Sequence, residues 1–555
     1  MVEAETLREI RHGRAKRPLR VLSLLSLLSA LVVGLPLLSV AIDALQPASD
    51  VWSHVAGRLI PRYLMNTVWL CLGVGGLTGC IGVGAAWLIT TYRFRGRQLL
   101  EWALILPLAI PSYVQAYIYY DLTNVSGPIQ TGLRSWLDVR ADQFTLPPLS
   151  SVPGAILVLS IALYPYVYLA ARTGFLQQTG TLVEISRMLG CTPTAAFFRV
   201  TLPLARPAIV VGLSLVLMET LADYGAVSLL GVQTFTTGIY KAWFSMGDRV
   251  AAAQLASILL LIVLVLVFTE LSHRRGQFFN TGNDTPAVAQ RLAGVSGAAA
   301  LVACFLPAFL GFLLPAGYLL HMLAGVPDNP SIGFGDAVVN TLAVAMATAS
   351  IAVALGLFMT YGARLAPSRM ITFLNRVAAM GYAVPGPVLA IGTLVPLVAL
   401  DHAIDQLAQR FWGIQPGLLI TGSIGALVFA YLARFMTVSL GAIEAGFAKV
   451  KPSLEDAAAV LGLGTLDRLR RVHLRLIGPS IATAGLLVFV DVMKELPATL
   501  ILRPFDFDTL AVRVFNLARD ERLAEAALPA LILILVGLVP VIILSRQFSR
   551  EKPDL

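Results

Sequence analysis

The sequence predicts an all-α membrane protein with about twelve transmembrane helices in two parallel repeats of six helices. Three observations support this prediction: the composition, the series of long apolar segments and an internal duplication. Of the 555 residues, 57% are hydrophobic and only 13% are charged. A helix needs about 20 apolar residues to cross a hydrocarbon layer about 30 Å thick. Such a composition indicates a multi-span membrane protein and excludes a soluble enzyme.

The predicted spans are apolar segments separated by polar interruptions, centred near residues 33, 77, 110, 162, 218, 261, 311, 349, 386, 428, 490 and 535. The basic amino-terminal region and first span are too long, and too poor in a small-residue cleavage site, for a signal peptide. We therefore interpret the first span as a retained anchor. The expected organisation is a basic tail at 1–20, a first half at 21–272, a linker at 273–298, a second half at 299–547 and a tail at 548–555.

Basic residues indicate the orientation of the spans. If the amino-terminal tail is cytoplasmic, the loops on its side hold 29 of the 41 Lys and Arg residues, a count that includes Arg434. The opposite loops hold eleven, and Lys494 lies within a span. Cytoplasmic loops are enriched in basic residues, so we expect both termini in the cytoplasm. The net charge of +9 follows from this topology and requires no nucleic-acid partner.

An internal duplication divides the chain into its two halves. Asn66–Thr67 recurs as Asn340–Thr341, and LPLAIPSYV at 106–114 recurs as MGYAVPGPV at 380–388, both at an offset of 274. An offset of 272 then aligns the later segments of the two halves, including Glu219 with Asp491 and Asp223 with Glu495. Six spans per half is an even number, so both halves enter the membrane in the same orientation.

The first of two duplicated polar segments lies at 184–203. Thr181 and Glu184 fit a capping box that starts a short helix, and Gly190 ends this helix. Thr192–Pro193 then fits the cap and first residue of a second helix. We expect prolines from Pro203 onward to redirect the chain into the fifth span.

The second polar segment, at 456–475, follows the same plan. Ser453 and Asp456 are the expected cap pair, Gly462 the expected stop, and Thr465 the expected cap of the next helix. Arg475 stands where the first copy has Pro203. Both segments are therefore predicted to form two short helices joined at a glycine on the cytoplasmic side.

These segments resemble the cytoplasmic "EAA" loop of binding-protein-dependent ABC importer permeases, in which an acid is followed six positions later by a glycine and then by Leu-Pro. The first copy matches closely, whereas the second has Asp456 for glutamate and Arg475 for proline. The resemblance implies that two coupling loops, at about 176–206 and 444–478, dock onto two separate ATPase subunits. It implies that the ATPase-coupling residues are Glu184, Gly190, Pro203, Asp456 and Gly462.

A wider resemblance covers nearly the whole chain. LPLAIPSYVQAYIYYDL, GAILVLSIALYPYVYLAAR, METLADYGAVSLLGVQTFTTGIYKAWFSMGDRVAAAQLA and the fused two-half layout are similar to ferric-iron importer permeases. This resemblance implies the type I ABC importer fold in each half, a bacterial inner-membrane location, and ferric iron delivered by a periplasmic solute-binding protein. Thiamine, sulfate, molybdate and polyamine permeases share the architecture, so these substrates remain open.

The sequence contains no G-x-x-x-x-G-K-[ST] phosphate-binding loop. We therefore expect a transport subunit rather than an enzyme, with ATP and Mg²⁺ bound by the partner ATPases and no cofactor in this chain. The alternative from another class is a twelve-span secondary transporter driven by an ion gradient. Paired docking loops favour the ABC permease.

Four acidic residues in predicted spans are candidate functional groups: Glu219, Asp223, Asp491 and Glu495. A charge at a helix centre costs about 2.5–3.5 kcal/mol on insertion scales, so such residues are rarely incidental. Residues four apart share a helical face, and each half would present two carboxylates together. We expect them to line the translocation pathway or to brace the helices, and both alternatives stay open.

No resident metal site is expected. The tyrosines of the third and fourth spans are interpreted as interfacial aromatic belts rather than iron ligands, and the six histidines share no ligand spacing. On the outer side, the charged segment 503–525 and the segment 121–151 are candidate surfaces for a binding protein, with a solvated loop as the alternative.

Overall fold

The computed structural model describes residues 24, 26–47, 52, 55–140, 142–177, 185–186, 188–274, 290–325, 333–365 and 368–550. Within these ranges the chain is almost entirely helical, apart from a short parallel pairing of β1 (Tyr92–Arg93) with β2 (Gln290–Arg291). The first span is Ser26–Ala44. The predicted all-α membrane fold is confirmed.

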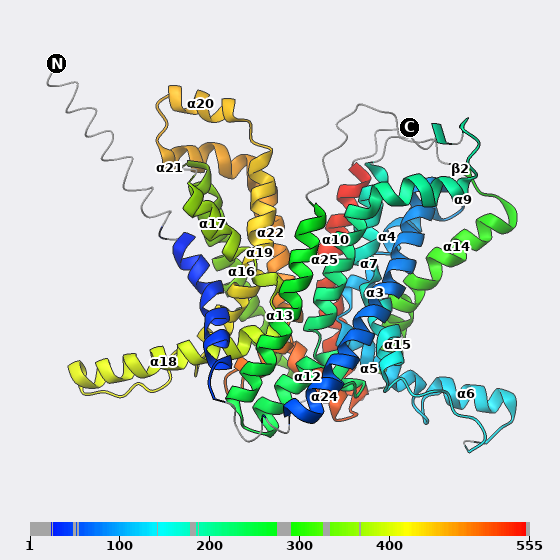
Figure 1. Cartoon of the computed structure of the whole chain (residues 1–555), viewed down its shortest axis with the longest axis horizontal. Coiled ribbons are helices and arrows are strands. Elements are labelled where there is room, and N and C mark those ends of the chain that lie inside the picture. The colour runs from blue at the N-terminus through cyan, green and yellow to red at the C-terminus, as the bar shows by residue number, and fades with distance from the viewer. Residues whose placement is uncertain are drawn as a thin grey trace. The chain divides into compact units, whose positions relative to one another are not determined.

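The first half continues with α3 to α13, shown from blue to green in Figure 1. The helices are α3 Ile60–Thr91, α4 Arg97–Ala103, α5 Ser112–Thr123, α6 Pro128–Leu137, α7 Val152–Leu176, α9 Pro193–Ala196, α10 Leu202–Ala222, α11 Gly225–Leu229, α12 Phe235–Tyr240 and α13 Arg249–Arg274. Short π-helical turns occur at Val55–Leu59, Phe197–Thr201 and Lys241–Ser245, and a 3₁₀ turn at Leu106–Ala109.

The second half repeats this order, in green to red. Its helices are α14 Gly294–Ala308, α15 Leu314–Ala324, α16 Phe334–Leu365, α17 Arg369–Ala378, α18 Gly386–Trp412, α19 Ile424–Ala448, α20 Pro452–Val460, α21 Thr465–Arg468, α22 Leu474–Lys494, α23 Pro497–Leu502, α24 Leu510–Arg519 and α25 Leu523–Arg550. Its π-helical turns lie at Phe309–Leu313 and Leu469–His473, and a 3₁₀ turn at Gly381–Ala383.

The described residues contain eleven helices long and apolar enough to cross a membrane, or up to twelve when a bent pair is counted as one span. The bent pair is Arg97–Ala109 with Ser112–Leu137, which meet at 93°. The bend follows from Pro111, which cannot donate a backbone hydrogen bond. The predicted number of about twelve spans is therefore confirmed, with the span near residue 110 broken at its proline.

Both offsets of the duplication recur in the helix bounds. α16 begins and ends 274 residues after α3, whereas α19 and α22 begin and end 272 residues after α7 and α10. The π-helical turn before α22 likewise follows the one before α10 by 272 residues. The two halves therefore fold as repeats, even where their sequences differ.

The chain forms two compact units that exchange segments between the halves. One unit contains 1–46 with 335–509, and the other contains 47–334 with 510–555. In the first unit, Gly392 of α18 lies against Pro36, where a Cβ would approach the Pro36 carbonyl oxygen to 2.2 Å. The first span of the chain thus packs within the unit built from the second half.

The first span of the second half packs in the other unit in the same manner. Pro315 has no N–H to donate along its helix, which leaves nearby carbonyl groups free for other donors. The Tyr119 hydroxyl donates to the Leu310 carbonyl at 2.5 Å, and the Gln115 amide donates to the Gly311 carbonyl at 3.0 Å. These side chains of α5 satisfy buried backbone groups that lipid could not.

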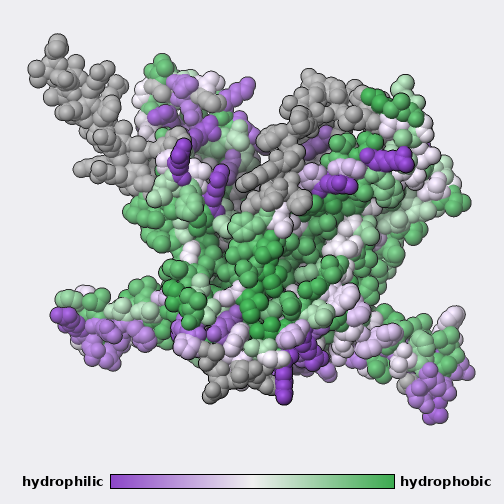
Figure 2. Space-filling model, viewed as in Figure 1, coloured by the Kyte–Doolittle hydropathy of each residue, from purple (hydrophilic) through white to green (hydrophobic). Residues whose placement is uncertain are grey.

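Hydropathy agrees with a membrane location for each unit. Figure 2 shows hydrophobic residues over the middle of each unit and hydrophilic residues mainly toward its ends. Apolar side chains stay exposed along the spans, for example Trp69 at 59% and Leu72 at 64%. In lipid this exposure carries little cost, because the surrounding acyl chains are themselves apolar.

Candidate coupling loops and intramembrane carboxylates

The first coupling loop turns at Gly190, as predicted. Gly190 has φ +88°, a left-handed conformation that favours glycine. Thr192 accepts a hydrogen bond from the Ala195 amide at 3.3 Å, and α9 begins at Pro193, so the predicted cap and first residue are confirmed. Glu184 and the capping box that includes it lie outside the described residues.

The second coupling loop turns at Gly462, whose φ is +80°. α20 begins at Pro452, so Ser453 lies inside the helix and the prediction that it caps the helix is wrong. Thr465 is the first residue of α21, with Gly464 in the cap position, so that prediction is also wrong. The first of these helices starts before Ser453 and the second starts at Thr465 itself, and Pro452 suits a first helical position because it needs no N–H partner there. Asp456 lies exposed within α20.

Each loop exposes two large apolar side chains directly before its glycine. Met188 and Leu189 are 86% and 80% exposed, and Val460 and Leu461 are 88% and 80% exposed. These pairs are equivalent at the offset of 272. Paired apolar side chains beside a polar loop are typical of a docking element for another protein.

The prolines of the first loop do not redirect the chain, contrary to the prediction. Residues Thr194–Ala222 form one continuous candidate span of 29 residues, in which Pro203 lies partly buried near the start of α10. The π-helical turn Phe197–Thr201 directly precedes Pro203, and its wider hydrogen bonding lets the helix continue where one donor is missing. α9, the π-helical turn and α10 are therefore one continuous helix.

An ion pair holds the second loop to the ends of the neighbouring spans. Nε of Arg364 lies 2.6 Å from Oε1 of Glu455, and Nε2 of the buried His473 lies 3.4 Å from the same oxygen. Arg364 also donates to the carbonyl groups of Phe447 and Val450 at 2.6 and 2.7 Å. One arginine thus joins the ends of α16 and α19 to α20. Sequence reasoning missed this cluster, although Glu455 directly precedes Asp456.

Aromatic packing occupies the matching place in the first half. Trp87 packs against Phe197 with ring centroids 4.5 Å apart, and Phe175 lies 6.3 Å from Phe197. At the two offsets, Thr90 and Thr201 stand where the second half has Arg364 and His473. The second half has aromatic packing at the equivalent positions, with the rings of Tyr361 and Phe447 6.2 Å apart. The second loop thus adds the Arg364–Glu455 ion pair to an aromatic contact that both halves share.

Asp223 and Glu495 share one backbone role. α10 ends at Ala222 and α22 at Lys494, and each acid follows in an extended conformation. Asp223 accepts hydrogen bonds from the amides of Ala226 and Val227 at 2.9 and 3.2 Å, at the start of α11. The prediction that Glu219 and Asp223, or Asp491 and Glu495, share one helical face is wrong, because the helix ends before the second acid.

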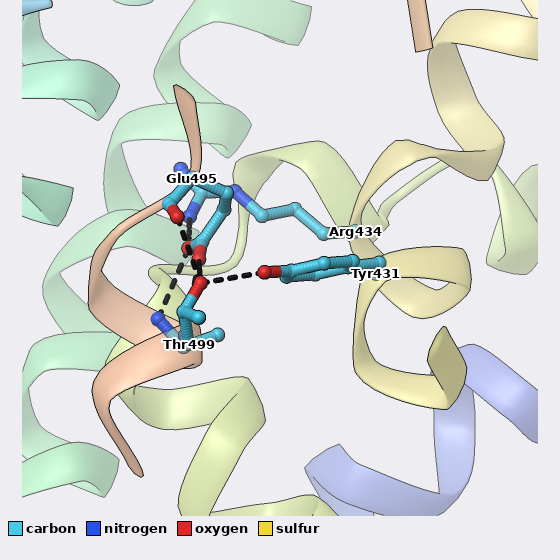
Figure 3. A network of polar contacts seen from close by, with 5 residues as sticks. Tyr431, Arg434, Glu495 and Thr499 are labelled. Atoms are coloured by element: carbon cyan, nitrogen blue, oxygen red, sulfur yellow. Dashed lines mark hydrogen bonds and ion pairs between the residues drawn. The ribbon is translucent and has the colours of Figure 1, made fainter. Parts of the chain in front are cut away.

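Glu495 lies in a buried polar network, shown in Figure 3. One carboxylate oxygen accepts from Arg434 at 2.9 Å and from the Ala498 amide at 3.0 Å. The other accepts from the amide and the hydroxyl of Thr499 at 3.2 and 2.9 Å. The Thr499 hydroxyl also lies 2.5 Å from the Tyr431 hydroxyl. The network joins α19 to the start of α23.

Arg434 lies within α19 and is 8% exposed, so its assignment to a cytoplasmic loop is wrong. The equivalent residue of the first half is Ala162. There, Asp223 instead accepts from the Ser112 hydroxyl at 2.5 Å. The position equivalent to Ser112 is Gly386, where a Cβ would approach Arg434 to 2.7 Å and Glu495 to 2.9 Å. A glycine is required beside the larger ion pair.

Glu219 and Asp491 are half-buried on α10 and α22, and Lys494 is the last residue of α22.

The tyrosines of the third and fourth spans differ from expectation. Tyr113, Tyr117, Tyr119, Tyr164 and Tyr168 are all at least nine-tenths buried, so the aromatic-belt interpretation is wrong for them. They fill contacts among α5, α7 and neighbouring helices, as the Tyr119 bond to Leu310 illustrates.

The fold and the coupling loop agree with comparison to known proteins. Residues 79–275, which include α7, the first coupling loop and α10, match the family described as "Binding-protein-dependent transport system inner membrane component". The chain is therefore a permease component of this class of transport system, and a multi-pass protein of the inner membrane.

Among individual relatives, the chain is 27% identical over 532 residues to the Fe(3+)-transport system permease protein FbpB 2 of Haemophilus influenzae, covering 93% of this chain and 97% of that protein. It is 28% identical over 205 residues to the sulfate transport system permease protein CysW of Escherichia coli K12, covering 36% and 67%. It is 29% identical over 191 residues to the molybdenum transport system permease protein ModB of that organism, covering 33% and 80%.

Proposed function

We propose that this chain is the transmembrane permease subunit of an ATP-driven ABC importer that admits ferric iron to the cytoplasm. The similarity that supports iron extends over 93% of the chain and includes both halves, whereas the sulfate and molybdenum permeases match 36% and 33% of it. Thiamine and polyamines are the further substrates of the same architecture. Ferric iron is the cargo here and not a resident cofactor.

Two ATPase subunits are the proposed cytoplasmic partners. The observation that carries this proposal is the duplicated pair of exposed apolar side chains before Gly190 and Gly462. ATP and Mg²⁺ would bind to those subunits, and this chain would receive their motion through Glu184, Gly190 and Pro203 in the first loop and Asp456 and Gly462 in the second. This places both loops, both termini and the 273–298 linker between the halves 21–272 and 299–547 in the cytoplasm. The periplasmic solute-binding protein would dock on the opposite side.

Bracing is the role we propose for Asp223 and Glu495. Each acid accepts two backbone N–H bonds from the short helix that follows the end of its span, which supports a structural role. Asp223→Asn retains an oxygen acceptor for these bonds, so we expect normal folded yield and transport within about twofold of the unchanged protein. Loss of transport at normal folded yield would instead favour a direct role in the pathway.

The function is tested by reconstitution of the chain with its ATPase and binding protein. We expect iron uptake that requires ATP, requires the binding protein and continues when the proton gradient is collapsed. The ATPase should co-purify with the chain, and Gly190→Ala should weaken this association. Uptake that persists without ATP and stops with the ion gradient would contradict the proposal and favour a secondary transporter. ATP-dependent uptake of sulfate or molybdate alone would overturn only the assignment of iron.

A further inference from the structure

The helix α6 turns its polar side toward its own protein. Gln130 and Arg134, one turn apart, are only 2% and 9% exposed. The Gln130 amide donates to the Thr123 carbonyl at 2.7 Å. Arg134 donates to the carbonyl groups of Phe144 and Val125 at 2.9 and 2.8 Å, and to Gln130 at 2.7 Å. The polar side chains of α6 are thus engaged by the segments on either side of it.

The apolar side of α6 points away from the protein. Ile129, Trp136 and Leu137 are 36%, 80% and 45% exposed, and Leu133 lies between them on the same face. A helix on a water-exposed surface normally has the opposite arrangement, with its apolar stripe against the core. An apolar stripe of this kind needs a cover other than water.

The second half contains the same inversion at the end of α18. Asp401 is fully buried and accepts hydrogen bonds from the amides of Ile420 and Thr421, both at 2.8 Å. Asp405, one turn later, accepts from the Gly417 amide at 3.0 Å. This helical end also exposes large apolar side chains, Leu400 at 46%, Leu407 at 52%, Phe411 at 68% and Trp412 at 73%, beside exposed polar residues such as Gln406 and Arg410.

Both helices occupy the same place in their units. α6 precedes α7 and α18 precedes α19, whereas the coupling loops follow α7 and α19. Each helix therefore lies at the end of its unit opposite the coupling loop, and Figure 1 shows each leaving its unit sideways. The unit that contains α6 also exposes Trp69 and Leu72, in the amino-terminal part of α3.

We propose that α6 and the carboxyl-terminal part of α18 lie in the lipid–water interface of the outer leaflet, as two lateral membrane anchors. Tryptophan is enriched at this interface, and amphipathic helices lie in its plane with their apolar face toward the acyl chains. The stripe residues carry no charge, which suits a lipid surface better than a polar binding-protein interface. The spans beside them already present a surface to lipid, so the anchors extend an existing contact.

The proposal is tested by tryptophan quenching in the full transporter reconstituted in bilayers. The signal of Trp136 is the fluorescence of the unchanged protein minus that of Trp136→Phe, and the signal of Trp412 is obtained in the same way. We expect lipids brominated near the headgroup end of the acyl chain to lower both signals about twofold, and lipids brominated near the chain terminus to quench less. Aqueous acrylamide should have little effect on either signal.

The matched control moves the indole by one residue, in the double variant Ser135→Trp and Trp136→Phe. Ser135 is exposed but lies off the apolar stripe, so its indole should be quenched mainly by acrylamide. Equal acrylamide quenching at positions 135 and 136 would overturn the proposal. Protection of Trp136 only after the binding protein is added would also overturn it and would identify a protein-docking surface instead.

Discussion

At the scale of single residues, equivalent carboxylates occupy different electrostatic surroundings in the two halves. Asp223 and Glu495 bond to backbone amides at equivalent positions, yet Ser112 donates to the first and Arg434 to the second. The second half places a full ion pair where the first has a hydroxyl and a carboxylate. Removing one partner of a buried ion pair destabilises a fold, because the remaining charge is then buried with nothing to offset its loss of hydration.

This difference predicts the effect of removing Glu495. Glu495→Ala deprives Arg434 of its carboxylate and should lower stability by about 3–5 kcal/mol, the usual cost of breaking a buried pair. Thermal unfolding of the purified protein in detergent measures the loss. Adding Arg434→Met removes the second charge and should restore a large part of the stability. A double variant no more stable than Glu495→Ala would show that the ion pair is not the cause.

The two loop glycines give a second prediction at this scale. Gly190 and Gly462 have similar positive φ angles, and a Cβ would meet no neighbour within 4 Å at either. Alanine should therefore introduce a similar strain at both, about 1–2 kcal/mol. We expect Gly190→Ala to reduce ATPase coupling more than Gly462→Ala, because the first loop matches the docking pattern more closely. Equal losses in transport-coupled ATP hydrolysis would show that the loops are equivalent.

At the scale of elements, the coupling loops are joined to their spans in two ways. α9 continues into α10 and α21 into α22 through a π-helical turn in both halves. Only the positions of the second half supply Arg364, Glu455 and His473, which link α20 to α16 and to the π-helical turn before α22. Arg364 also donates to the carbonyl groups of Phe447 and Val450 at the end of α19. These side chains therefore fix α20 to the ends of three spans, those that contain α16, α19 and α22.

Arg364→Met tests this connection, since methionine keeps much of the side-chain volume and removes the charge and three donors. We expect folded yield to stay near normal, because the spans pack through other contacts, and transport-coupled ATP hydrolysis to fall severalfold as α20 loses its attachment. Arg471→Ala is the matched control. Arg471 is exposed and lies 3.9 Å from Asp467, so its removal should change little. Equal effects of the two variants would contradict a positioning role for Arg364.

Sequence patterns predicted these elements well where the signal is local. Gly190 and Gly462 reveal the turns because a left-handed residue favours glycine, and the two offsets align helices to the residue. The same reasoning failed where a contact joins distant segments. Arg434 looks like a loop cation until Glu495, 61 residues later, is placed beside it. Likewise, prolines at 203 and 207 indicate a break unless the preceding π-helical turn is known.

At the scale of the whole molecule, the compact units differ from the two halves of the sequence. Each unit contains the first span of the opposite half of the sequence. Ser26–Ala44 belongs to the unit with 335–509, and the region that contains α14 and α15 belongs to the unit with 47–274. Each compact unit therefore depends on a span that the other half of the sequence supplies. The division of the sequence by its repeats gives no indication of this exchange, because the apolar pattern of a span does not reveal its neighbour.

The exchange predicts how the chain behaves when divided within the 273–298 linker. Each half expressed alone lacks a span that its own unit requires, so we expect aggregation or degradation. Co-expression of 1–284 and 285–555 should restore a stable complex, because every described helix stays intact. Size-exclusion chromatography of the two halves, together and apart, measures the outcome. A single half that is monodisperse and resists proteolysis would contradict the prediction.

The π-helical turns that precede α10 and α22 determine how far α9 and α21 are rotated about the helix axis relative to the spans that follow them. A π turn accommodates one residue more than an α-helical turn, and one residue corresponds to about 100° of rotation about the helix axis. Deleting a single residue from Phe197–Thr201 would therefore keep the helix continuous but rotate α9 about its axis. The loop that α9 carries, with Met188 and Leu189, would then point in another direction. The direction in which each loop points is thus determined by the length of a five-residue turn, independently of the side chains that the loop exposes.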